Sequence, residues 1–206
     1  MIILQIFIFI ITTWLGLSVI YMLIYAVSGL FYKSEVVLNN ETFPTIAVLI
    51  PAFKEDAVIV SVAKKALEQN YQGRFEIFVI ADSLKLITLI ELSNLSISII
   101  EVTFKKSTKA KALNYAMLKI GDEYDIAMIL DADNVMANNV LSIMASKFVQ
   151  GSLAIQGHRC AKNQNTKFAL LDGISEEVNN NIYCKGPATL NLSSRLVGSG
   201  MSFHYP

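Results

Sequence analysis

The chain has 206 residues, of which 17 are basic and 17 acidic, so its formal net charge is zero. A protein without net charge has no overall field that attracts polyanions, and we therefore expect no nucleic-acid partner. The two cysteines, Cys160 and Cys184, are too few for a disulfide framework or a cysteine-rich zinc site. We expect both to be buried free thiols in a reducing compartment.

The N-terminal segment, residues 1–32, contains no charged side chain and consists mainly of Ile, Leu, Val, Phe and Tyr. About 20 apolar residues are enough to cross a bilayer, and the basic start and short apolar core of a secretory signal are missing. We predict a retained membrane-spanning helix, followed by a polar linker at 33–44. A buried core helix is disfavoured because the segment has no polar face. Lys33 follows the span and no Lys or Arg precedes it, which favours a cytoplasmic domain after a single span.

The remainder, residues 45–206, alternates between short apolar runs and segments with helical spacing. The predicted strands cover residues 45–50, 74–81, 95–102, 124–130 and 153–156, and Pro51 is expected to end the first of them. The predicted helices cover residues 56–70, the stretch between Ser83 and Leu92, 109–120 and 138–149. This alternation predicts an α/β fold, Rossmann-like, with a mostly parallel sheet and flanking helices. Right-handed crossovers would bring the strand ends to one edge.

Two carboxylates, Asp131 and Asp133, follow the apolar run 126–130. Two acids one residue apart on extended backbone point to the same side, and open α/β sheets bind ligands at the carboxyl ends of their strands. Mg²⁺ commonly takes one or two carboxylates and completes its shell with water and substrate phosphate oxygens. The pair predicts a metal–diphosphate site. The alternative is that both acids simply form a turn after the strand.

Three further polar groups are expected at the same edge: residues 51–55 after the first strand, Asp82 after the second, and the lysines Lys105, Lys106, Lys109 and Lys111. Asp82 could accept hydrogen bonds from a base or a ribose, although it could equally cap a helix. Lys109, at a helix start, could meet a phosphate, although these lysines could also form a solvated helix face. Together with the two carboxylates, these groups indicate a nucleotide-diphosphate site.

Other functional patterns are weaker. The sequence contains no phosphate-binding loop G-x-x-x-x-G-K-[ST] and no G-x-G-x-x-G after a strand. His158 and His204 lie too far from other ligand types in the sequence to suggest zinc. Glu176 and Glu177 fall in a helical pattern at 170–181, and we expect them on a solvated helix face.

Read together, these segments resemble family 2 glycosyltransferases of the GT-A fold, in particular membrane-bound members of the processive type. The matching segments are Val48–Glu55 (family pattern P-x-[YF]-N-E), Val79–Ser83 (D-D-x-S), Lys109–Asn114 (G-K-x-x-A-L-N), Asp131–Asp133 (D-x-D), Gln156–Arg159 and Val197–Phe203. The chain departs from the family where Lys54 replaces Asn, Ala81 replaces the first Asp, and Thr108 replaces Gly.

The resemblance implies inverting transfer of a sugar from a nucleotide-diphosphate sugar, a UDP-sugar, to a hydroxyl of a saccharide or lipid acceptor. It implies a divalent metal, Mg²⁺ or Mn²⁺, held by Asp133 and Asp131. The implied nucleotide-sugar residues are Pro51, Ala52, Glu55, Asp82, Lys109 and Asp131, and the implied acceptor side is Gly198, Ser199, Gly200 and Met201. The family's catalytic base is expected beyond Pro206, so we expect a domain that is truncated at its C-terminus and retains donor binding.

Two alternatives remain. Asp131 to Val135 also resembles the D-x-D-x-[TV] motif of haloacid-dehalogenase-type phosphatases, but that motif usually follows the first core strand, and here about three strand–helix units precede it. The other alternative is a membrane-anchored interaction module that keeps the GT-A fold without the chemistry.

Overall fold

The computed structural model describes residues 1–33, 42–162 and 165–205, so most of the predicted linker 33–44 and Pro206 lie outside the described residues. The chain divides into two compact units. We call Val36–Gly157 with Leu196–Pro206 the sheet unit, and Met1–Glu35 with His158–Arg195 the helical unit.

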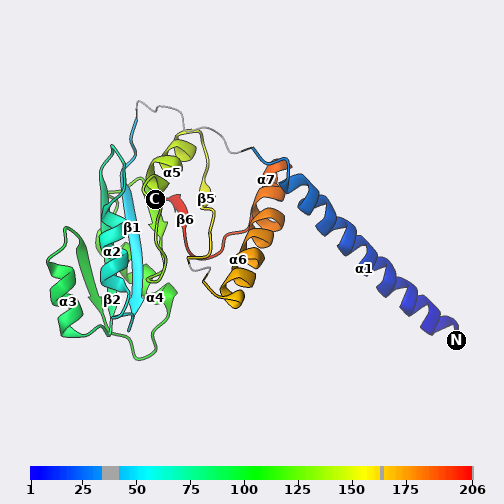
Figure 1. The fold of residues 1–206 in the computed structure, drawn as a ribbon, viewed down its shortest axis with the longest axis horizontal. Helices are drawn as coiled ribbons and strands as arrows, with labels where there is room; N and C mark the ends of the chain where they lie inside the picture. Colours follow the sequence, from blue (N-terminus) through cyan, green and yellow to red (C-terminus); the bar gives the residue numbers. More distant parts are fainter. Residues whose placement is uncertain (34–41, 163–164, 206) are drawn as a thin grey trace. The chain divides into compact units, whose positions relative to one another are not determined.

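The sheet unit is built on six strands in the order β3-β2-β1-β4-β6-β5 (Figure 1). The strands are β1 Ile46–Phe53, β2 Phe75–Asp82, β3 Ser98–Val102, β4 Ile126–Ile129, β5 Ala154–Gln156 and β6 Met201–His204. The pairs β1–β2, β2–β3 and β1–β4 are parallel. Strand β6 runs antiparallel to both of its neighbours. The predicted α/β fold with a mostly parallel sheet is confirmed.

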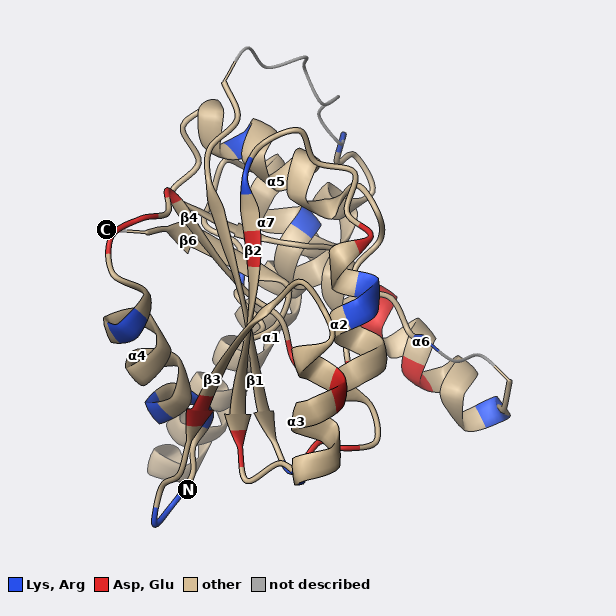
Figure 2. Ribbon diagram, turned by 90° about the vertical axis from the view of Figure 1, so that its left-hand side faces the viewer, with Lys and Arg blue, Asp and Glu red and all other residues tan. Residues whose placement is uncertain are grey.

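Helices cover both faces of this sheet. They are α2 Ile59–Leu67, α3 Leu86–Ser93, α4 Lys109–Ile120 and α5 Val140–Val149. Alternate residues of β1 enter opposite cores: Ile46, Val48 and Ile50 pack with residues of α2 and α5, whereas Ala47 and Leu49 pack with α4. Burial on both faces is usual for parallel strands connected by helices. Figure 2 shows Lys residues along α4, which carries Lys109, Lys111 and Lys119.

The prediction that Pro51 ends the first strand is wrong, because β1 continues to Phe53. The backbone of Leu49 faces β4, since its carbonyl accepts a hydrogen bond from Leu130 N at 3.0 Å. Pro51 is two residues further on and therefore faces the same side, yet β4 pairs with β1 only along Ile46–Leu49. The N–H that proline lacks would point past the end of β4, so its absence breaks no ladder bond.

The helical unit begins with α1, Ile2–Gly29, a 28-residue helix whose side chains are exposed along nearly its whole length. Among the described residues it is the one helix long and apolar enough to cross a membrane. The helical unit also contains three consecutive helical segments: α6 Lys167–Asn180, the π-helix η1 Asn181–Lys185, and α7 Gly186–Thr189. The predicted helical pattern at 170–181 therefore lies in α6 and the first residue of η1.

The end of α1 packs closely on η1 and α7. The Asn181 side chain donates a hydrogen bond to Ala26 O at 2.9 Å. A methyl group on Gly29 would overlap Asn181, and one on Gly186 would overlap the backbone of Tyr25. These two glycines therefore permit a contact between backbones that larger residues would prevent.

The cysteine prediction is wrong for Cys160. Its side chain is exposed, whereas Cys184 is half-buried, and both are free thiols. Burial raises the pKa of the Cys184 thiol. Cys160 lies in a segment without regular secondary structure after β5, and no hydrophobic pattern in the sequence marks that segment as exposed.

Candidate functional site at the carboxyl ends of the strands

The D-x-D motif lies on a turn, not on extended backbone as we predicted. Strand β4 ends at Ile129. Residues Asp131 to Asn134 then form a turn closed by a hydrogen bond from Asn134 N to Asp131 O at 3.0 Å. The two acids therefore do not point to the same side for the reason we gave, because side chains alternate between two sides only along a strand. The turn nevertheless directs both towards one cleft, with Asp131 half-buried and Asp133 exposed.

That cleft has a volume of about 370 Å³ and lies where β1, β2 and β4 end and α4 begins. It is lined by Pro51, Ala52, Phe53, Glu55, Asp82, Ser107, Thr108, Lys109, Ala112, Asp131, Ala132 and Asp133. Every residue assigned above to nucleotide-sugar or metal binding is in this set. The four residues assigned to the acceptor side, Gly198 to Met201, are not among the lining residues. The volume falls in the range of about 300–1,000 Å³ that is usual for small-molecule sites.

Lys109 connects several parts of the cleft. It is the first residue of α4, after the cap Thr108, whose hydroxyl accepts a hydrogen bond from Lys111 N at 3.3 Å. Its ammonium group donates to the Asp131 carboxylate and to the carbonyl of Gly198. Because the free N–H groups at the start of a helix also favour negative charge, this end of the cleft can accept an anion.

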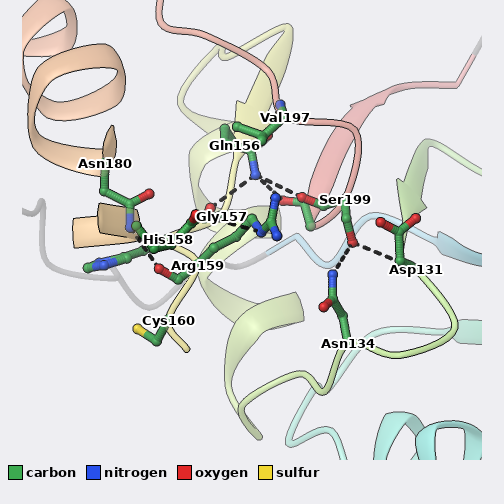
Figure 3. Close-up of polar contacts among 12 residues, drawn as sticks. Asp131, Asn134, Gln156, Gly157, His158, Arg159, Cys160, Asn180, Val197 and Ser199 are labelled. Atoms are coloured by element: carbon green, nitrogen blue, oxygen red, sulfur yellow. Dashed lines mark hydrogen bonds and ion pairs between the residues drawn. The ribbon is translucent and has the colours of Figure 1, made fainter. Parts of the chain in front are cut away.

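The Asp131–Asn134 turn is held by Ser199, which is fully buried. The Ser199 hydroxyl oxygen accepts hydrogen bonds from Asp131 N at 2.9 Å and from the Asn134 side-chain amide at 2.6 Å (Figure 3). On either side of it, Gly198 and Gly200 have φ values of 82° and 65°, which favour glycine. Ser199 can therefore reach the turn because a tight loop of small residues brings it there.

Gln156, at the end of β5, holds this loop from the other side. Its side-chain nitrogen donates to Ser199 O at 2.9 Å, and its side-chain oxygen accepts from Val197 N at 2.8 Å (Figure 3). Sequence reasoning gave Gln156 and Asn134 no role in positioning the site. The signal that points to them is the small-residue loop Gly198–Gly200, which needs polar partners for its backbone.

The loops after β1 and β2 are also tied together. Asp82 is 2% exposed, and one of its carboxylate oxygens accepts a hydrogen bond from the Ser83 hydroxyl at 3.0 Å. The Asp82 carbonyl accepts from Lys54 N at 3.1 Å. Lys54 and Ser83 have φ values of 57° and 58°, so both loops turn sharply through the left-handed region. These turns place Asp82 and Glu55 in the lining of the cleft.

The donor chemistry of the cleft fits a hard divalent cation. Asp131 and Asp133 offer carboxylate oxygens, the ligands that Mg²⁺ and Mn²⁺ prefer, and both line the cleft. Asp131 is already paired with Lys109, so a cation at Asp131 competes with that ammonium group.

A six-stranded sheet with one inserted antiparallel strand, carrying a polar cleft at its carboxyl edge, defines a GT-A-type domain, and solved structures support this class. The mannosyltransferase PcManGT from Pyrobaculum calidifontis, in complex with GDP-Man and Mn²⁺, has a TM-score of 0.62 at 18% identity. A mycobacterial protein has a TM-score of 0.50 at 15% identity, and the match covers 79% of this chain and 53% of that one. Staphylococcus aureus TarS 1–349 in complex with UDP has a TM-score of only 0.49 at 14% identity, covering 59% of this chain and 38% of that one, and the class does not rest on this match.

Residues 47–195 match the family model for glycosyl transferase family 2, and the chain belongs to that family. No curated protein matched the chain. The match to PcManGT covers 89% of this chain and 52% of that protein, so the chain spans about half the length of the mannosyltransferase.

Proposed function

We propose that the cleft binds a nucleotide-diphosphate sugar, a UDP-sugar, and that the protein transfers the sugar with inversion to a hydroxyl of a saccharide or lipid acceptor. The observation that carries this proposal is the convergence of Asp82, Lys109, Asp131 and Asp133 in one cleft at the carboxyl ends of the strands. Membership of glycosyl transferase family 2 supports it.

The proposed roles follow from the positions in the cleft. Asp82 and the Pro51–Glu55 loop would contact the nucleoside, with the buried Asp82 carboxylate accepting hydrogen bonds from the base or ribose. Lys109 would bind the diphosphate, since its ammonium group stands beside the start of α4. Gly198 to Met201 would lie on the acceptor side, where glycines allow a sugar to approach the backbone closely. In-line attack needs a base to deprotonate the acceptor hydroxyl.

Asp131 and Asp133 would hold the divalent metal, Mg²⁺ or Mn²⁺. When bound, the metal would supply electrostatic stabilisation of the charge that develops on the leaving diphosphate. The Mn²⁺ bound with GDP-Man in PcManGT supports this choice of cofactor. Ser199 would fix the turn that carries both acids, so that neither has to be ordered when the donor binds.

We further propose that α1 spans a membrane once and that the sheet unit lies on the cytoplasmic side. The length and apolar surface of α1 support the span, and Lys33 immediately after it supports the orientation. If α1 is a membrane span, alkaline carbonate washing leaves the full-length chain in the membrane fraction. Release of the chain into the supernatant would show that α1 is not inserted.

The donor site is tested by calorimetric titration of the detergent-solubilised chain with UDP, with and without Mn²⁺. GDP serves as a second nucleotide to test the preference for uracil. We expect binding that requires the metal and is lost in Asp133→Asn, which removes the charge but keeps the size of the side chain. Asp172→Asn on α6 is the matched control and should bind as the unaltered chain does.

Metal-dependent binding that persists in Asp133→Asn would remove Asp133 as a ligand. Failure of the folded chain to bind any nucleotide would overturn the proposal and favour the interaction module. Metal-dependent release of phosphate without a nucleotide requirement would favour the phosphatase alternative.

A further inference from the structure

The helical unit brings together three side chains of types that bind transition metals. They are His158, Cys160 and Glu177, and one ligand atom of each lies within 4.8 Å of the other two. His158 Nε2 is 2.7 Å from Glu177 Oε1, and Cys160 Sγ is 3.9 Å from the same oxygen. All three residues are exposed, so a cation can reach them from solvent.

Neighbouring contacts fix the two segments that carry these residues. The Asn180 side chain, at the end of α6, donates to the carbonyl of Arg159 at 2.7 Å (Figure 3). The Arg159 side chain pairs with Glu176 at 3.6 Å. Arg159 therefore contacts Glu176 while the residues before and after it both contact Glu177. This alternation holds His158 and Cys160 on the same side of their segment, next to α6.

We propose that His158, Cys160 and Glu177 form a binding site for Zn²⁺ or a similar transition-metal ion. Imidazole, thiolate and carboxylate are the three ligand types that zinc uses in proteins, and sites with three protein ligands keep a fourth position for water. Mg²⁺ and Ca²⁺ prefer all-oxygen sites, so the nitrogen and sulfur ligands select against them. Binding converts the Cys160 thiol to a thiolate and releases its proton to solvent.

Lys185 pairs with the second oxygen of the Glu177 carboxylate. Its ammonium group lies 4.0 Å from Glu177 Oε2, the oxygen that does not contact His158. One carboxylate oxygen is therefore directed to a cation of the protein, and the other, Oε1, is directed to His158 and Cys160. The bound ion would replace the contact between His158 and Glu177 and connect the segment at 158–160 to α6.

This site is chemically distinct from the carboxylate pair in the cleft and does not depend on the proposed function. Asp131 and Asp133 offer oxygen alone, whereas the new site includes sulfur. A Co²⁺ ion bound by a thiolate shows a sulfur-to-metal charge-transfer absorption, which oxygen ligands do not produce. Co²⁺ therefore reports on Cys160 without interference from the D-x-D motif.

The experiment is titration of the full detergent-solubilised chain with Co²⁺, followed by displacement with Zn²⁺ and monitored by absorption. We expect a thiolate–Co²⁺ band that is lost in Cys160→Ser and kept in Cys184→Ser, the control at the other cysteine. His158→Gln and Glu177→Gln should each raise the Kd for Zn²⁺ by at least about tenfold, since even loss of a supporting residue around a metal costs 10–100-fold. Asp172→Asn, at an exposed carboxylate elsewhere on α6, is the control for Glu177→Gln and should leave the Kd unchanged.

A second measurement needs no substitution. In the unaltered chain, Zn²⁺ should slow alkylation of Cys160 and leave alkylation of Cys184 unchanged, as mapped by mass spectrometry. The proposal is overturned if the folded chain shows no thiolate–Co²⁺ band and no zinc protection of Cys160. It is also overturned if the band survives Cys160→Ser, or if His158→Gln and Glu177→Gln bind Zn²⁺ as the unaltered chain does.

Discussion

Ser199 is the residue whose removal tests most directly how the D-x-D turn is held. Its hydroxyl oxygen accepts one hydrogen bond from the backbone of Asp131 and one from the side chain of Asn134, and it is fully buried. Ser199→Ala deletes this one oxygen and leaves two donors without their partner. An unsatisfied buried donor costs about 1–3 kcal/mol. Because Asp131 and Asn134 are half-buried and water can partly replace the oxygen, we use the lower end for each and expect a loss of about 2 kcal/mol.

The chain supplies a matched control three residues away. Ser202 in β6 is also fully buried, and its hydroxyl contacts the sulfur of Met144 at 2.8 Å. Thioether sulfur is a weak acceptor, and Ser202→Ala leaves no N–H group without a partner. We therefore expect a loss below about 1 kcal/mol for Ser202→Ala.

Thermal unfolding followed by far-UV circular dichroism distinguishes the two variants. For a chain of this size, 1 kcal/mol corresponds to about 2–4 °C in Tm, so Ser199→Ala should lower Tm by about 4–8 °C. The same variant should weaken metal-dependent UDP binding, whereas Ser202→Ala should leave it unchanged. Equal Tm values for Ser199→Ala and Ser202→Ala would refute the conclusion that Ser199 stabilises the turn.

Three further changes test other parts of the fold. The pKa of Asp56 is lowered because its carboxylate accepts hydrogen bonds from the Thr88 hydroxyl and from Lys85 N. The stabilisation that the Asp56 carboxylate provides is therefore present above the ordinary pKa of 3.8 and is lost as the pH falls through the lowered pKa. Asp56→Asn should lower Tm at neutral pH and make the decline of Tm on acidification shallower, and parallel curves for the two proteins would contradict this. Lys54 has a φ of 57°, so Lys54→Asn should raise the free energy of unfolding by about 0.5 kcal/mol, since asparagine tolerates the left-handed region better; a decrease in denaturant titration would count against strain at this position. Gly186→Ala should cost about 1–3 kcal/mol through overlap with Tyr25, whereas Gly16→Ala, in open space on α1, should be neutral or slightly stabilising in the same assay.

The features that the sequence predicts well are those with local causes. Helix α4 runs from Lys109 to Ile120 as predicted, because Thr108 caps its start and Gly121, with φ 72°, ends it. The cleft was predictable for a related reason: parallel strands joined by right-handed crossovers must bring their carboxyl ends to one edge. Asp82, Lys109 and Asp131 could therefore be placed together without knowing any contact between them.

The features that the sequence did not predict depend on distant partners. Pro51 was expected to end β1, and it fails to do so because β4, about 80 residues later in the chain, stops short of it. The D-x-D turn depends on Ser199, which is separated from Asp131 by 68 residues. The cluster of His158 and Cys160 with Glu177 depends on the way one irregular segment lies along α6. No local sequence pattern predicts these contacts between residues that lie far apart in the chain; only the folded structure shows them.

The ion pair between Lys109 and Asp131 couples the binding of the metal to the binding of the nucleotide diphosphate at the proposed site. A metal at Asp131 must displace the Lys109 ammonium group, and a diphosphate at Lys109 must draw it away from Asp131. Each ligand therefore removes an interaction that competes with the other, and the two should bind with positive, reciprocal coupling. Lys109→Met separates the effects, because it frees Asp131 while removing the proposed phosphate contact. In calorimetric titrations, Lys109→Met should bind Mn²⁺ more tightly in the absence of nucleotide and bind UDP more weakly in its presence. Weaker binding of both ligands would show that Lys109 positions Asp131 for the metal and does not compete with it.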